Sequence, residues 1–115
     1  MRVKIDIRIT HSVIKLNRRA VKAMNAKAGQ VLRMTEDEDG NVLISAIDNP
    51  DDMYMGKLCP LSTCGLSCSN KQIAERILQG ASNGAFRIGE SVNLGDSWWV
   101  SVITRKNYAN QEFIL

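Results

Sequence analysis

The stretch IKLNRRAVKAM at residues 14–24 decides the fold of this chain, because a variant of it returns at residues 66–77 as LSCSNKQIAERI. Each version has three residues of strand character, then a helix-capping residue, then a short amphipathic helix. The segments that follow also recur, with LRM at 32–34 matched by FRI at 86–88, and VLISAI at 42–47 matched by WWVSVI at 98–103. An order of strand, helix, strand, turn and strand that occurs twice predicts two repeats packed around a pseudo-two-fold axis, since neither could bury its apolar face alone. The alternative is a chance match between two amphipathic patterns.

The composition is that of one globular domain. The chain has 115 residues, of which 44% are hydrophobic and 23% are charged, and this is enough for a single core. No apolar run approaches the roughly 18 residues that a bilayer-spanning helix needs, and the start MRVKID is charged where a signal peptide is apolar. Three cysteines, an odd number, fit a reducing compartment. We therefore expect a cytoplasmic protein that does not enter a membrane, organised as repeat one at 1–49, a linker at 50–56 and repeat two at 57–115.

The local patterns place the elements of each repeat. Val3 to Thr10 alternates strictly, with Val3, Ile5, Ile7 and Ile9 on one face and the polar residues on the other, which is typical of a half-buried strand. Asn17 is a good N-cap for the first helix, and Asn70 or Ser69 for the second. Gly40 suits a hairpin turn after the acidic run at 36–39. Further strands are expected at 13–16, 31–35, 42–47, near 57–59, and at 66–68, 85–88 and 98–104, with a turn at 93–96. The strand at 42–47 is almost wholly apolar, so both of its faces should be covered.

Positive charge is concentrated at the start of the chain. Residues 1–33 hold nine Lys or Arg and a single acid, Asp6, whereas residues 34–56 hold seven acids and no Lys or Arg. A basic first third predicts a surface that faces a polyanion. The competing interpretation is that the acidic segment lies over the basic one and neutralises it, or that its charges are only hydrated.

The motif around residues 14–34 resembles the AbrB/MazE/SpoVT swapped-hairpin family. In that family an I-x-I-P strand-to-helix entry leads into a short helix and then into L-x-P-G-D and a strand. Leu16 takes the place of the strand isoleucine, and Asn17 stands where the family has proline. Ala23 and Met24 match the Ala-Leu of the family's helix, and Lys27 and Gly29 match the K-x-G of the family's loop. Gln30 stands where the family has aspartate. The Gly-Arg that precedes the family's first inner strand is absent, because these positions are Ser12 and Val13.

The resemblance implies a small interleaved β-barrel that binds DNA as a regulator or neutralises a toxin. Members of the family contact DNA through basic residues on their hairpins and helix starts. The residues that could serve here are Lys4, Arg8, Lys15, Arg18, Arg19 and Lys22. Each could neutralise a phosphate, and each arginine could also fork onto a guanine edge. For any one of them the alternative is a hydrated charge on an amphipathic element. A palindromic site would require a homodimer of whole chains.

Other chemistry has little support in the sequence. Cys59, Cys64 and Cys68 could form a Cys₃His zinc site with His11, but their spacing is not that of a zinc knuckle, and Cys68 occupies a strand position that favours packing. His11 fits a surface turn. No P-loop, no H-E-x-x-H and no ordered Ser/His/Asp set is present. We therefore predict neither metal nor cofactor, and no enzymatic activity.

The adjacent Trp98 and Trp99 are the remaining unusual feature. On a strand their rings point to opposite faces, so one should be in the core and the other free to anchor a partner. The sequence thus predicts an α+β protein, a mostly β small barrel of two pseudo-symmetric strand-helix-strand-strand repeats with two short helices. Its predicted function is DNA-binding regulation through the basic first repeat. The alternative is a non-enzymatic interaction or assembly module on the same fold, with Trp98 or Trp99 and the C-terminal tail as its contact surface.

Overall fold

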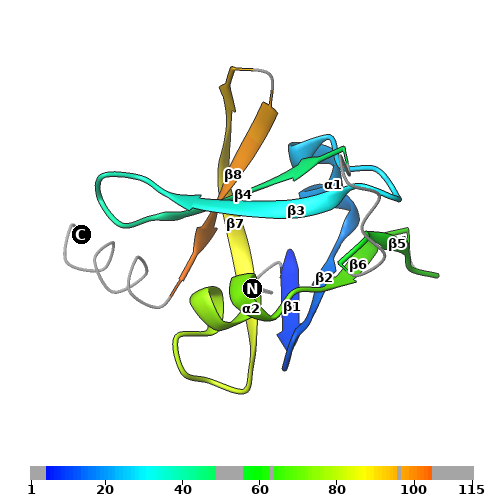
Figure 1. Ribbon diagram of the computed structural model, residues 1–115, viewed down its shortest axis with the longest axis horizontal. Coiled ribbons are helices and arrows are strands. Elements are labelled where there is room, and N and C mark those ends of the chain that lie inside the picture. Colours follow the sequence, from blue (N-terminus) through cyan, green and yellow to red (C-terminus); the bar gives the residue numbers. More distant parts are fainter. Residues whose placement is uncertain (1–4, 49–55, 63, 96, 105–115) are drawn as a thin grey trace.

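The computed structural model describes residues 5–48, 56–62, 64–95 and 97–104, which form a mostly β structure with two short helices (Figure 1). The elements in chain order are β1 Ile7–Thr10, β2 Val13–Leu16, α1 Arg18–Met24, β3 Val31–Glu36, β4 Val42–Ile47, β5 Cys59–Pro60, β6 Leu66–Ser69, α2 Lys71–Leu78, β7 Asn83–Leu94 and β8 Ser97–Ile103. The predicted α+β class is therefore confirmed. Of the predicted linker at 50–56, only Gly56 lies within the described residues.

One antiparallel sheet contains all eight of these strands, in the order β3-β4-β8-β7-β1-β2-β6-β5. The sheet curls, so that β3 and β4 cross β1 and β2 at a steep angle in Figure 1. Its two ends are joined where Val31 bridges to Lys57 and where the Leu58 amide donates to the Gln30 carbonyl at 2.8 Å. Three of the strand pairs, β4 with β8, β7 with β1 and β2 with β6, join distant parts of the sequence.

The core fills the inside of the curl. Inward-facing residues of β1 and β2 are almost fully buried, and residues of β4 and β8 face them: Ile7, Ile9, Ile14, Leu16, Val42, Ile44, Val100 and Val102. The opposite side of β4 is only partly covered, because Leu43 and Ile47 keep intermediate exposure. The expectation that this strand is covered on both faces is therefore met on one face only.

The first strand is shorter than its alternating pattern predicts. It begins at Ile7, and Val3 and Lys4 lie outside the described residues. Asp6, predicted to point outward, is instead 1% exposed. Its backbone amide donates to the Phe86 carbonyl at 2.9 Å, and its backbone carbonyl accepts from the Asn17 amide at 2.9 Å. The prediction for Asp6 was wrong because these long-range bonds draw the chain into the interior.

Both predicted helix caps are confirmed. The Asn17 side chain accepts from the Ala20 amide, and the Asn70 side chain accepts from the Ile73 amide, so each satisfies a donor that the first turn leaves free. Helix α1 buries Ala20 and Met24 against the core, and α2 buries four residues. No helix among the described residues is long and apolar enough to cross a membrane.

The hairpin of β7 and β8 is longer than expected and extends beyond the rest of the sheet (Figure 1). The predicted strand at 85–88 is only part of β7, and Asn93 and Leu94, predicted to form a turn, pair with Trp98 and Ser97. The register shifts between Ile88 and Ser91, which inserts an extra residue opposite β8. Such a bulge bends and twists the strand, so the far half of the hairpin leaves the barrel.

Candidate nucleic-acid interface

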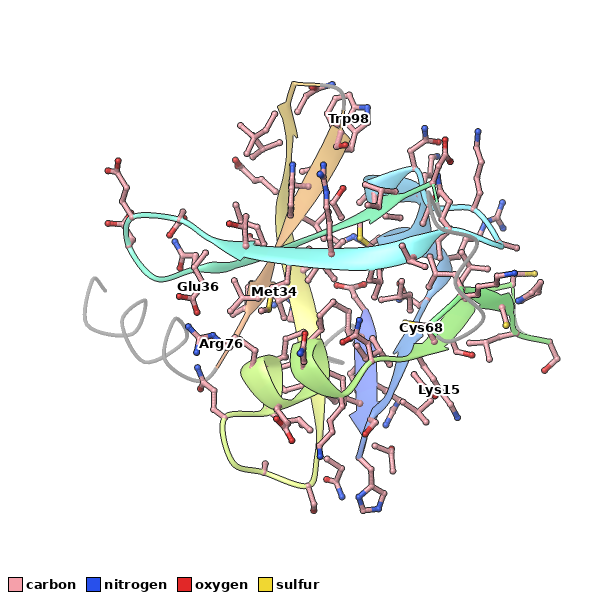
Figure 2. All side chains as sticks on the ribbon, viewed as in Figure 1. Lys15, Met34, Glu36, Cys68, Arg76 and Trp98 are labelled. Atoms are coloured by element: carbon pink, nitrogen blue, oxygen red, sulfur yellow. The ribbon has the colours of Figure 1, made fainter. Side chains whose placement is uncertain are left out.

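Two of the predicted DNA-contacting residues lie side by side on the outside of the sheet. Since Ile7, Ile9 and Ile14 point inward, the residues between them point outward, and Arg8 pairs directly with Lys15 across β1 and β2. Both side chains are exposed (Figure 2 labels Lys15), and neither forms an ion pair within the described part of the chain. Like charges directly opposite each other destabilise a sheet. This pair therefore has an unfavourable interaction that a bound anion would relieve.

A small hollow lies beside this pair. Its volume is about 190 Å³, and Arg8, Lys15 and Asn17 line it together with Ile5, Asp6, Leu16 and Leu61. Arg8 and Lys15 at its edge could attract an anionic group such as a phosphate, although the Asn17 amide is already bonded to Ile5 and Asp6 and the Asp6 carboxylate also lines the hollow. The geometry therefore places a candidate anion site on the β1–β2 face.

Helix α1 carries three more of the predicted residues, and the structure separates their roles. Arg18 and Lys22 are exposed and have no ion-pair partner among the residues described. Arg19 donates to the Asp6 carboxylate at 3.2 Å, with about half of its own side chain exposed (51%). Arg19 thus holds α1 to the residue immediately before β1, so it is less available to DNA than its neighbours. Lys4, the sixth predicted residue, lies outside the described residues.

Asp6 is the residue that sequence reasoning missed. Its carboxylate accepts from the Asn17 side-chain amide at 3.1 Å, from Arg19, and from the Ile88 backbone amide at 3.1 Å. These contacts join β1, the start of α1 and β7 beneath the basic surface. A signal was present, because Asp6 is the only acid among the first 33 residues.

The acidic segment does not neutralise the basic one in the part of the chain that the structure describes. Glu36, at the end of β3, forms its ion pair with Arg76 of α2, with Arg76 Nε 2.6 Å from the carboxylate (Figure 2). Asp37 is committed to its own turn, where Asn41 and the Asp39 amide donate to its carboxylate. Neither residue contacts a cation of residues 5–33, so the basic surface stays uncovered by them.

Cys59 lies near Cys68 across β5 and β6, but the three cysteines do not form one cluster with His11. Cys59 and Cys64 are exposed, whereas Cys68 is buried in the core, and burial, together with the nearby Cys59, raises the pKa of its thiol to about 11. Within the described residues no three His, Cys, Asp or Glu side chains are placed to hold a metal ion. The zinc site considered from the sequence, with His11 and the three cysteines, is thus not assembled.

The two tryptophans differ in exposure as predicted, but the buried one, Trp99, lies on the outer face of the sheet beneath Arg33 and not in the core. Trp99 is 8% exposed, and Trp98, near the tip of the β7–β8 hairpin, is 43% exposed (Figure 2). Val92 and Leu94 on the same hairpin are also exposed. The hairpin therefore offers apolar surface at a distance from the basic residues.

Comparison of the chain with family models, with curated proteins and with solved structures gives no match. The resemblance to the swapped-hairpin family therefore rests on the residues of the motif and remains a prediction.

Proposed function

We propose that this protein binds double-stranded DNA as a regulator, through the outer face of β1 and β2 and the exposed side of α1. The observation that carries the proposal is the direct opposition of Arg8 and Lys15 on an exposed face with no acidic partner among the described residues. Arg18 and Lys22 extend the same positive charge onto the helix. Each of these side chains would neutralise one phosphate and release counterions, which is the main source of sequence-independent affinity for DNA. A cytoplasmic location is part of this proposal.

The test compares two double variants of equal net charge. Arg8→Ala with Lys15→Ala should weaken binding to a short duplex, measured by fluorescence anisotropy over a salt series. It should also reduce the slope of log K against log salt by about two phosphate contacts, roughly 1.8. Lys27→Ala with Lys71→Ala removes two exposed cations from elsewhere and should change the slope much less.

The helix is tested separately. Replacing Arg18, Arg19 and Lys22 together by Ala should lower the slope by fewer than three contacts, because Arg19 is engaged with Asp6. A wild-type protein that binds no duplex DNA even at low salt would overturn the proposal.

We propose further that the chain is one domain of two repeats, at 1–49 and 57–115, related by a pseudo-two-fold axis. Two strand pairs support this. Lys15 of β2 pairs with Ser67 of β6, and Ile44 of β4 pairs with Val100 of β8. When the two repeats are aligned, Lys15 matches Ser67 and Ile44 matches Val100. A pseudo-two-fold axis that passes between two strands pairs such equivalent residues with each other.

The backbone of the chain gives independent support for the repeats. Among the described residues, four that are not glycine have positive φ, and they fall into two pairs at matching places. His11 and Cys64 lie between the first two strands of each half, and Asn25 and Gln79 cap the helix C-termini. If the proposal is correct, residues 1–50 alone should be unfolded or should dimerise. A monomeric fragment that unfolds cooperatively would refute it.

The second candidate function is a protein-interaction or assembly module. The exposed Trp98 on a projecting hairpin favours it, since tryptophan is a frequent interface anchor. Trp98→Ala should leave DNA binding unchanged under the first function, and should abolish partner binding under the second.

A further inference from the structure

Arg19 differs from the other cations of the proposed DNA-binding surface, because its guanidinium is already held by the protein. Its Nη1 donates to Oδ2 of Asp6 at 3.2 Å. The other cations of this surface form no ion pair in the part of the chain that the structure describes: Arg8, Lys15, Arg18 and Lys22. The surface thus combines one arginine in a fixed position with cations that are free to follow a phosphate.

Asp6 is a rigid support for that arginine. Its side chain has no exposed surface (0%). Its carboxylate also accepts from the Ile88 backbone amide and from the Asn17 side-chain amide, each at 3.1 Å. Turning the carboxylate away would leave these donors without an acceptor, which is unfavourable for a buried group. The guanidinium of Arg19 is therefore held by an acceptor that is itself fixed.

The ion pair leaves most of the donors of Arg19 available to a ligand. An arginine side chain ends in a planar fork of N–H donors, and Arg19 forms no hydrogen bond with the described residues other than the one to Asp6. About half of its side chain is exposed (51%). Ordering a long side chain during binding normally costs conformational entropy. For Arg19 much of that ordering is complete once the protein has folded, so the fork is ready for an acceptor.

The charge of Asp6 decides which part of DNA Arg19 would contact. A phosphate bound to Arg19 would lie close to the Asp6 carboxylate, and the two anions would repel each other. The edge of a base carries no net charge, so it meets no such repulsion. Guanine presents two acceptors, O6 and N7, next to each other in the major groove, and they match the fork of an arginine. An arginine held by a carboxylate therefore suits guanine better than it suits the DNA backbone.

The position of the Asp6–Arg19 pair fits this role. Asp6 lines the same hollow of about 190 Å³ as Arg8 and Lys15, so Arg19 lies beside the cations that would bind phosphates. Phosphate contacts fix the position of a protein on a duplex, whereas contacts with base edges give sequence preference. The two kinds of contact are thus available next to each other on this surface.

We propose that Arg19 is the specificity-determining residue of this surface, donating to O6 and N7 of one guanine in the major groove while Asp6 positions it. The inference rests on the proposed DNA binding and adds the base that is read. It gives two adjacent arginines different roles, because Arg18, which has no such support, contacts the backbone only.

Selection from a random pool of short duplexes, followed by fluorescence anisotropy on the selected duplex, tests the proposal. Wild type should prefer a particular guanine, and adenine at that position should weaken binding by about tenfold or more. Replacing the guanine by 7-deazaguanine, which lacks N7, should also weaken binding, whereas inosine, which keeps O6 and N7, should not. With Arg19→Ala all four duplexes should bind equally. Arg19→Lys should lose the preference as well, because lysine keeps the charge but not the fork.

Two further variants separate base reading from a general loss of charge or of folding. Arg18→Ala removes the same charge from the neighbouring position of α1. It should weaken binding to every duplex alike, lower the slope of log K against log salt by roughly 0.9, and leave the guanine preference unchanged. Asp6→Asn removes the repulsive charge and loosens Arg19, so affinity for random duplexes and the salt slope should rise while the guanine preference falls. Loss of a purely structural contact would not raise affinity.

The outcomes distinguish this inference from the proposed function. A wild type that binds duplex DNA without a guanine preference would overturn the inference and leave DNA binding standing. An Arg19→Ala or Arg19→Lys protein that keeps the preference would do the same. A wild type that binds no duplex DNA even at low salt would overturn both.

Discussion

Replacing Asp6 with Ala should destabilise the protein by about 3 kcal/mol, a large part of the roughly 5–15 kcal/mol that holds a domain folded. The largest contribution is the Ile88 amide, which would be left buried without the acceptor that now lies 3.1 Å away. Asn17 would lose one bond but keep the other, from its side-chain amide to the Ile5 carbonyl at 3.0 Å. The guanidinium of Arg19 is about half exposed and would be rehydrated, so its ion pair adds little.

This reasoning predicts an order among three variants. Asp6→Ala should cost most, Asp6→Asn about half as much, because one acceptor oxygen is retained, and Arg19→Ala less than about 1 kcal/mol. Urea unfolding followed by tryptophan fluorescence gives the midpoint and the slope m, and m should stay constant if only stability changes. An Asp6→Ala protein within about 1 kcal/mol of wild type would refute the argument. An Arg19→Ala protein as unstable as Asp6→Ala would show that the ion pair dominates instead.

Three further predictions concern the core and its thiols. Ile44→Asp and Val100→Asp should each lower the free energy of unfolding by roughly 4 kcal/mol or more, because each would place an unpaired carboxylate in the core, where Ile44 and Val100 are neighbours. Unequal midpoints of unfolding in urea would count against the equivalence of β4 and β8. Gly65→Ala should lower the melting temperature markedly, because an added Cβ would overlap the backbone carbonyl of Leu16; an unchanged melting temperature would show that β2 and β6 can separate there. Burial raises the pKa of Cys68 from 9.0 to about 11. Between these values the folded state keeps a neutral thiol, whereas the unfolded state ionises it. The stability that is fully present below pH 9 should therefore be lost as the pH rises towards 11. Cys68→Ala should show a smaller loss over this range, and in the folded wild type Cys59 and Cys64 should react with a thiol reagent far faster than Cys68.

The elements that the sequence predicts well are those set by neighbours in the chain. The strands at 13–16 and 42–47 have the predicted bounds, and Asn17 caps α1 through an amide three residues away. Periodicity and capping act over a few residues, so they can be read without the fold.

The features that the sequence does not predict depend on distant partners. Asp6 has the spacing of a surface residue, and its burial becomes favourable through distant donors, the Ile88 amide 82 positions away together with Asn17 and Arg19. The second half of β7 is polar and contains a bulge, and pairing with β8 is what makes it a strand. The candidate interface follows the same rule. Its basic residues can be named from the sequence, but the opposition of Arg8 and Lys15 depends on a strand register, and the withdrawal of Arg19 into an ion pair depends on Asp6.

The strand order has a consequence for how the protein acquires its structure during synthesis. β1 pairs with β7, β2 with β6 and β4 with β8, so the inner pairs of the sheet join early residues to late ones. Such a topology has a high contact order, and folding is slow when chain closure must precede most of the stabilising contacts. While the second half is still being translated, the apolar strands of the first half have no partners and are open to aggregation or chaperone binding. β8 is the last described strand and lies between β4 and β7, so the sheet can be completed only after β8 has left the ribosome.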